Sequence, residues 1–177
     1  MAIALRPWRR ADIEPLAQLA GDPDVSRFMS SRFPHPYRLE DAKQQVEFCL
    51  GYTGRDQFFA VTEGGRLCGG ANLGYFDGQR PGACGIGYWL GKPFWGRGLG
   101  SQVAELLCQR AFSDSEISCI EAYVVCENLG SIRILEHCGF TRFAVLPNAS
   151  QRDGVQRDVA RYRLRRTQGP NVETFSI

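Results

Sequence analysis

The hydrophobic and polar positions of the chain fall into two kinds of segment. Short apolar segments bounded by glycine, proline or other turn residues predict β-strands. They are residues 2–6, 57–63, 66–76, 84–91, 117–125, 140–146 and 156–165. Longer segments with apolar side chains every three or four positions predict helices with one buried face. They are residues 12–20, 39–50, 99–112 and 128–138. This order of elements favours an α/β protein, in which helices flank one mixed sheet.

Turn residues mark where the strands fold back on each other. Gly64-Gly65 and Asp153-Gly154 each stand between two strand segments, as in β-hairpins. The polar residues 167–177 predict a flexible C-terminal tail. The remaining residues 1–166 have the size of a single domain, so we expect one domain with one core.

Composition narrows the classes of protein and partner. The 177 residues are 44% hydrophobic with a net charge of +2, which argues against disorder and against a nucleic-acid partner. No apolar run is long enough to cross a membrane, and the N-terminus does not resemble a signal peptide. We therefore expect a cytoplasmic protein with no membrane partner. The seven cysteines include no Cys-x-x-Cys pair, so we expect neither a disulfide framework nor a metal site.

A glycine-rich segment lies between the strand 84–91 and the helix 99–112. Residues 94–100 read FWGRGLG and match neither a P-loop nor a dinucleotide fingerprint. Glycines at a helix start let successive backbone N–H groups point at one anion, and the helix dipole adds to the attraction. The alternative is a plain connection whose glycines only allow sharp turns. We favour an anion site, with Arg97 as an additional positive charge.

The start of the helix 128–138 is a second candidate site. Asn128 and Ser131 lie in its first turn, and Gly139 follows its end. Taken alone, these residues are typical of an ordinary capped helix. In combination with the glycine-rich segment, they indicate a site for a long phosphorylated ligand.

Five segments resemble the GNAT acetyltransferase superfamily, and more closely its ribosomal-protein N-terminal acetyltransferase branch, the RimJ/RimL type. The segments occur in the expected order, at residues 5–29, 33–42, 86–100, 119–140 and 152–164. The most specific are IGYWLGKPFWGRGLG and CIEAYVVCENLGSIRILEHCGF. The resemblance implies the GNAT acyl-CoA N-acyltransferase fold in a single domain, with acetyl-CoA as cosubstrate and no metal.

The resemblance also implies roles for individual residues. The backbone that would bind the pyrophosphate of acetyl-CoA belongs to Trp95, Gly96, Arg97, Gly98, Leu99 and Gly100. Tyr88, Trp89 and Leu90 would pair with the pantetheine arm, and a backbone N–H near Tyr88 would hold the acetyl carbonyl oxygen. Asn128 would also bind the pantetheine. Ser131 is the candidate acid for the departing thiolate, because the usual tyrosine position of the family is Leu135 here.

Two departures from the family pattern leave the general base unidentified. Relatives often have a carboxylate where this chain has Gly85, and some have one where it has Ser150. The nearby carboxylates are interpreted as solvated or structural groups. They are Glu121, Glu127, Asp153 and Asp158.

These observations lead to one principal hypothesis and two alternatives. The principal hypothesis is an acetyl-CoA-dependent N-acetyltransferase in which a primary amine attacks the thioester directly. The expected acceptor is the N-terminal α-amine of a protein or peptide, of the ribosomal-protein type, because an α-amine needs less help from a base than lysine does. The alternatives are a non-catalytic acyl-CoA-binding module and an acetyltransferase of small molecules such as antibiotics or polyamines. The oligomeric state is left open, a homodimer included.

Overall fold

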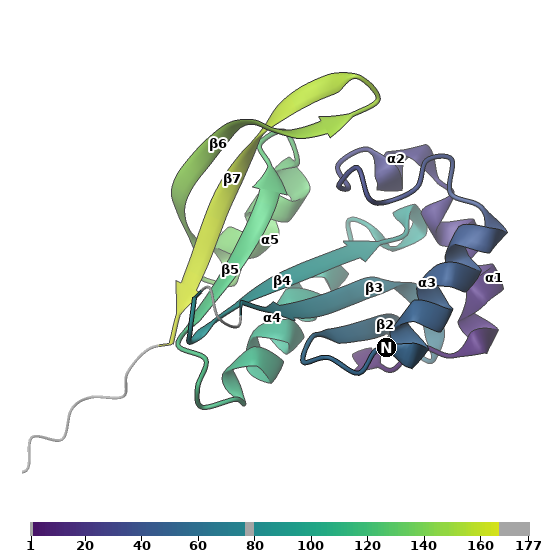
Figure 1. Cartoon of the computed structure of the whole chain (residues 1–177), viewed down its shortest axis with the longest axis horizontal. Helices are drawn as coiled ribbons and strands as arrows, with labels where there is room; N and C mark the ends of the chain where they lie inside the picture. Colours follow the sequence, from purple (N-terminus) through teal and green to yellow (C-terminus); the bar gives the residue numbers. More distant parts are fainter. Residues whose placement is uncertain (1, 77–79, 167–177) are drawn as a thin grey trace, which may run out of the picture.

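A seven-stranded sheet with helices on both faces forms the framework of the computed structural model, which describes residues 2–76 and 80–166 (Figure 1). The strands are β1 (Ile3–Arg6), β2 (Gln57–Glu63), β3 (Arg66–Tyr75), β4 (Ala83–Leu90), β5 (Cys119–Val125), β6 (Thr141–Arg152) and β7 (Val155–Arg165). The helices are α1 (Ile13–Ala20), α2 (Pro23–Ser26), α3 (Leu39–Gly51), α4 (Leu99–Phe112) and α5 (Leu129–His137). The predicted α/β class and flanked mixed sheet are confirmed. The predicted tail, residues 167–177, lies outside the described residues.

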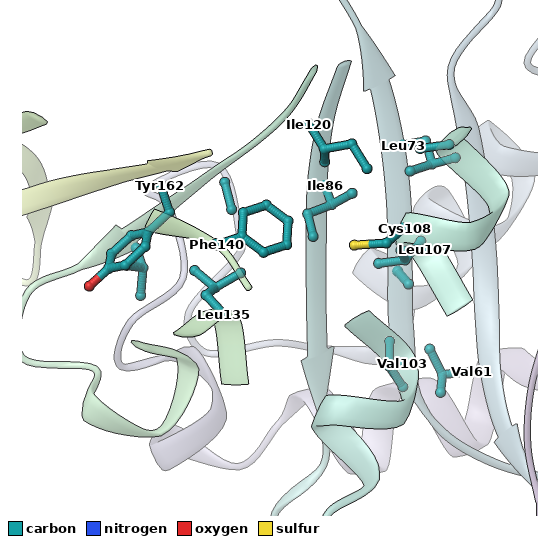
Figure 2. Packing of buried hydrophobic residues seen from close by; sticks show 14 of the residues in the cluster. Val61, Leu73, Ile86, Val103, Leu107, Cys108, Ile120, Leu135, Phe140 and Tyr162 are labelled. Carbon is teal, nitrogen blue, oxygen red and sulfur yellow. The ribbon is translucent and has the colours of Figure 1, made fainter. Parts of the chain in front are cut away.

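Side-chain alternation along the strands divides the core into two layers. Ala60 and Val61 are neighbours in β2 and are both fully buried, yet they pack in different clusters on opposite faces of the sheet. Helices α4 and α5 cover the face of Val61, where Figure 2 shows Leu107 and Leu135 among the buried side chains. Helices α1 and α3 cover the other face, with Val46 of α3 in its core.

The parallel neighbours β4 and β5 separate after a short contact. The strand order is β1-β2-β3-β4-β5-β7-β6, and β4 pairs with β5 only from Ala83 to Gly85, opposite Cys119 to Glu121. Figure 1 shows the two strands diverging beyond this point. We call residues 86–90 and 122–125 the β4–β5 split. On the edge of residues 86–90 that faces away from β3, no strand pairs with them among the described residues.

The hairpin of β6 and β7 is longer than the sequence predicts. β6 continues to Arg152 instead of ending near residue 146, with an irregular register between Leu146 and Ser150. Residues 147–152 show no apolar alternation, and the ladder to β7 is what holds residues 150–152 in the strand. Figure 1 shows the hairpin reaching from the β5 side of the sheet towards α2. The end of β6 therefore lies beside the N-terminal part of the chain.

The described residues show neither a membrane-spanning helix nor a metal-binding cluster. Among these residues, no helix is sufficiently long and apolar to span a bilayer. They also contain no cluster of three or more histidine, cysteine or acidic side chains that could hold a metal ion.

Candidate active site

The glycine-rich segment forms an open loop between β4 and α4. Gly96 and Gly98 adopt positive φ values of 69° and 72°, which favour glycine over other residues. A Cβ at either position would meet no described atom within 4 Å, so the space above the loop is open. Gly98 is the N-cap of α4 and has no side chain to accept hydrogen bonds from the first turn. The loop thus presents free backbone N–H groups and the positive end of a 14-residue helix to an anion.

Two side chains of this loop are engaged with the rest of the protein. Arg97 Nη2 lies 2.6 Å from Oε1 of the buried Glu63 at the end of β2. The indole Nε1–H of Trp95 donates to the carbonyl of Leu90 over 2.7 Å. Arg97 was expected to supply a mobile charge for the ligand, whereas in the structure its guanidinium anchors the loop. The backbone of the loop is therefore the part best placed to bind an anion.

The three residues of β4 next to this loop point to alternate faces of the sheet. Tyr88 and Leu90 pack on the face covered by α4 and α5, whereas Trp89 packs on the face of α1 and α3. The part of Tyr88, Trp89 and Leu90 that borders the β4–β5 split is consequently their backbone. This arrangement suits the expected pairing of β4 with an extended ligand, because one backbone edge is without a strand partner among the described residues.

Tyr88, Asn128 and Ser131 come together at the start of α5. The hydroxyl oxygens of Tyr88 and Ser131 lie 3.2 Å apart. The backbone N–H of Ser131 donates to Oδ1 of Asn128 over 3.2 Å, so Asn128 is the N-cap of α5. Burial raises the pKa of Tyr88, so its phenol stays protonated near neutral pH. The pair of hydroxyls therefore retains protons that it can donate.

A buried carboxylate lies at the closed end of the split. Glu121 is 4% exposed, and its Oε2 accepts hydrogen bonds from Arg80 over 2.5 Å and from Arg161 over 3.0 Å. Burial opposes ionisation of this carboxyl, but the hydrogen bonds from Arg80 and Arg161 outweigh burial and lower its pKa. A carboxylate held in this way is a weak base. The arrangement agrees with the structural role expected for Glu121.

Comparison with known proteins identifies the family. The family model described as Acetyltransferase (GNAT) domain matches residues 3–141, which is most of the chain. The chain belongs to the GNAT acetyltransferase family. It is an N-acetyltransferase that takes its acetyl group from acetyl-CoA, and this transfer requires no metal.

The relatives of this GNAT enzyme agree with the assignment. Over 165 residues, 92% of each chain, it is 28% identical to "Uncharacterized N-acetyltransferase p20" of Bacillus licheniformis. Its fold matches that of RimL, a ribosomal L7/L12 alpha-N-protein acetyltransferase in complex with coenzyme A, with a TM-score of 0.79, 19% identity and coverage of 93% and 94% of the two chains. It also matches spermidine N-acetyltransferase from Vibrio cholerae, in complex with CoA and spermine, with a TM-score of 0.76, 18% identity and coverage of 92% and 95%.

Gly85 and Ser150, the two positions where a carboxylate was looked for, have different surroundings in the structure. Gly85 is the last residue of β4 that pairs with β5, and a Cβ there would lie 3.0 Å from the Phe76 ring, so the ring occupies the space of a larger side chain. Ser150 lies in the β6–β7 hairpin, opposite Arg157. Neither position offers a proton acceptor with the strength of a carboxylate.

Sequence reasoning missed the hydroxyl of Tyr88 and the arginine partners of Glu121. Tyr88 was singled out for its backbone, yet its side chain is the group that meets Ser131. The alternation of β4 carried the signal, because Tyr88 shares its face with the apolar Ile86 and Leu90. The partners of Glu121 gave no local signal, since Arg80 and Arg161 are 41 and 40 residues away in the sequence.

Proposed function

We propose that this enzyme acetylates the N-terminal α-amine of a protein or peptide. The observation that supports this acceptor is the state of Glu121, the buried carboxylate at the split, which two guanidinium groups hold ionised. Without a strong base, the acceptor must supply its own neutral amine. Near pH 7.5, about one-third of an α-amine is neutral, compared with roughly 0.1% of a lysine side chain. The difference of about 250-fold corresponds to roughly 3.3 kcal/mol.

The loop and β4 are assigned the binding of acetyl-CoA. The backbone N–H of Trp95 donates to the carbonyl of Lys92, so the N–H groups of residues 96–100 are the part of the expected 95–100 segment that would bind the pyrophosphate, with the dipole of α4 adding to the attraction. The pantetheine arm would pair with the free edge of residues 88–90 within the β4–β5 split, and Asn128 would bind it from the start of α5. A backbone N–H near Tyr88 would then face the acetyl oxygen, where negative charge develops as the amine attacks.

Ser131 and Tyr88 are assigned the protonation of the leaving group. The amine nitrogen forms a bond to the acetyl carbon, the carbon–sulfur bond breaks, and the thiolate of coenzyme A takes up a proton. In this proposal Ser131 donates that proton and is resupplied by the hydroxyl of Tyr88, 3.2 Å away. The excess proton of the amine passes to solvent, and solvent returns a proton to Tyr88, so both hydroxyls are restored. No covalent bond to the enzyme forms at any stage.

Electrostatics favour this acceptor over a polyamine. Arg157, Arg161 and Arg163 alternate along β7 and so share one face, and Arg80 adjoins the same side through Glu121. Arg80 and Arg161 share the single carboxylate of Glu121, so this side keeps a net positive charge, which would repel a polycation such as spermidine or an aminoglycoside. The spermidine acetyltransferase with a similar fold is less than 25% identical to this chain, so its substrate does not transfer with the fold.

The proposal is tested by the position of the acetyl group on the product. We expect short peptides with a free N-terminus to be acetylated there, even when they contain lysine, and mass spectrometry of fragmented products locates the label. A matching peptide with a blocked N-terminus and a free lysine is the control, and it should remain unmodified. Acetylation mainly on lysine, or only on polyamines and aminoglycosides, would overturn the proposal.

A further inference from the structure

A buried arginine lies at the end of the β6–β7 hairpin. Arg152 is only 6% exposed, although it is the last residue of β6 and lies beside a two-residue turn. Its Nη1 donates to the carbonyl oxygens of Ser30 and Phe33 over 2.9 and 3.0 Å. These contacts join the hairpin to the segment between α2 and α3, more than a hundred residues away in the sequence.

The opposite edge of this guanidinium has no partner. Nε and Nη2 of Arg152 are both buried and form no hydrogen bond with the described residues. These two atoms belong to the edge of a guanidinium whose N–H bonds run parallel, which is the edge that binds a carboxylate through two hydrogen bonds. Buried polar groups are nearly always paired, and a buried charge without a partner is costly. The unpaired edge of Arg152 therefore suits an anion with two oxygens, which would reach it by displacing the groups that cover it from solvent.

Contacts connect Arg152 to the acceptor side of the split. The ring of Phe33, whose carbonyl binds Arg152, packs edge-on against the ring of Trp89 at 5.9 Å between centroids. Trp89 follows Tyr88 in β4 and points to the face opposite α5. If acetyl-CoA enters from the side of α4 and Ser131, the amine must approach from the face that carries Trp89 and Arg152.

The surroundings of Arg152 add positive charge. Arg152 pairs with Val155 and Ser150 pairs with Arg157, so Arg152 and Arg157 lie on the same face of the hairpin. Nη1 of Arg157 is also buried without a hydrogen-bond partner among the described residues. The face of the hairpin that carries Arg152 and Arg157 therefore attracts negative charge. One carboxylate of the acceptor can bind to the unpaired edge of Arg152.

We propose that Arg152 binds a carboxylate of the acceptor, so that the enzyme selects peptides with Asp or Glu among their first three residues. This inference rests on the proposed α-amine acceptor and adds the class of sequence that carries the amine. The carboxylate forms two parallel hydrogen bonds to Nε and Nη2, and it holds the adjacent α-amine near the thioester.

The test compares peptides that differ by one charge. Pairs with Asp or Asn, and with Glu or Gln, at each of the first three positions are assayed for kcat/KM with the full-length enzyme and acetyl-CoA. We expect the acidic peptide to be preferred at least about tenfold at one of these positions, mainly through KM, as for a hydrogen-bonded charge pair. Equal kcat/KM values within every pair would overturn the inference and leave the proposed α-amine acceptor intact.

Variants assign the preference to Arg152. Arg152→Gln should abolish the preference, and Arg152→Lys, which keeps the charge without the two-pronged edge, should restore only part of it. Arg142→Gln, on the exposed opposite end of β6, is the matched control and should keep the full preference. A preference that survives in Arg152→Gln would overturn the inference. If Arg152→Gln does not fold, the Arg152→Lys variant decides by the same comparison, and an undiminished preference there rules out bidentate binding.

A further assay distinguishes peptides from free amino acids. Free aspartate and glutamate carry the same carboxylates without a peptide chain, and we expect them to be poor acceptors compared with the acidic peptides. If only the free amino acids are acetylated, the proposed peptide acceptor and the selection of acidic peptides both fail.

Discussion

The contact between Tyr88 and Ser131 predicts two different responses to mutation. Ser131→Ala removes the hydroxyl that would protonate the thiolate but keeps the backbone N–H that donates to Asn128. We therefore expect α5 to keep its N-cap. The change also leaves the hydroxyl of Tyr88 without its partner, at a cost of about 1 kcal/mol or more because this hydroxyl is largely shielded from water. For a chain of this size, that cost lowers the Tm by about 2–4 °C.

The catalytic response is expected to be larger. A positioned proton donor contributes about 100-fold or more to the rate, so Ser131→Ala should lower kcat by about that factor with little change in acetyl-CoA affinity. Tyr88→Phe should lower kcat less, because water can resupply the proton to Ser131. If Tyr88 acts only through Ser131, the double variant should have the same kcat as Ser131→Ala.

A double-mutant cycle measures both responses with the same proteins. Steady-state kinetics give kcat and KM, and thermal unfolding without ligand gives the change in Tm. The double variant should be more stable than the sum of the two single changes indicates, because it removes both partners of one hydrogen bond. A native kcat for Ser131→Ala would refute the proton-donor role. Equal and additive losses of kcat would refute the relay and indicate that each hydroxyl reaches the sulfur independently.

Two further predictions concern the loop and Glu121. Acetyl-CoA at about 100 times its Kd should raise the Tm by about 5–10 °C. Gly98→Val should abolish this shift, whereas Gly65→Val, which imposes similar strain at φ 85° in the β2–β3 turn, should lower the basal Tm but keep the shift, as differential scanning fluorimetry would detect. The pKa of Glu121 is lower in the folded chain, so its charge stabilises the fold above the ordinary pKa of about 4.3, and this contribution is lost as the pH falls through the folded pKa. Denaturant titrations should therefore find Glu121→Gln destabilised by about 1–2 kcal/mol at pH 7, with the difference from the native protein shrinking as the pH falls below about 4, and a constant difference would contradict the assignment.

Local patterns in the sequence predict most of the elements of this fold. The segments around 57–76 and 99–112 carry clear periods and turn residues, and they form β2, β3 and α4 close to the expected bounds. The separation of β4 from β5 has no such signal. Apart from Glu121, both strands consist of apolar residues and glycine, and the pattern gives no indication that pairing stops after Gly85. The arrangement depends on how the two halves of the sheet pack, which is a property of the tertiary structure.

The residues of the candidate site also differ in how well the sequence predicts them. The glycines of the loop are visible in the sequence because positive φ angles demand them, at Gly96 and Gly98. The burial of Arg152 has no counterpart in the sequence, where it stands in a polar turn segment that is typical of solvent exposure. Its partners are 119 and 122 residues away, so only the docking of the hairpin against residues 30–33 reveals it. Sequence patterns thus disclose the groups that backbone geometry requires, and miss those defined by long-range contacts.

Side chains of β4 alternate between the two faces of the sheet, and this alternation explains why groups of the site lie on both faces. Consecutive side chains of a strand point to opposite faces, so Tyr88 meets Ser131 on the side of α5 while Trp89 meets Phe33 on the other. The donor groups and the charge of Arg152 are thereby kept on different sides of one strand. In the proposed complex, an acidic acceptor at Arg152 would keep its negative charge away from the loop of residues 95–100, where repulsion from the bound pyrophosphate would weaken the binding of both anions. With both proposed sites occupied, two anionic substrates would bind on opposite faces of one strand, and the amine and the thioester would meet at the split.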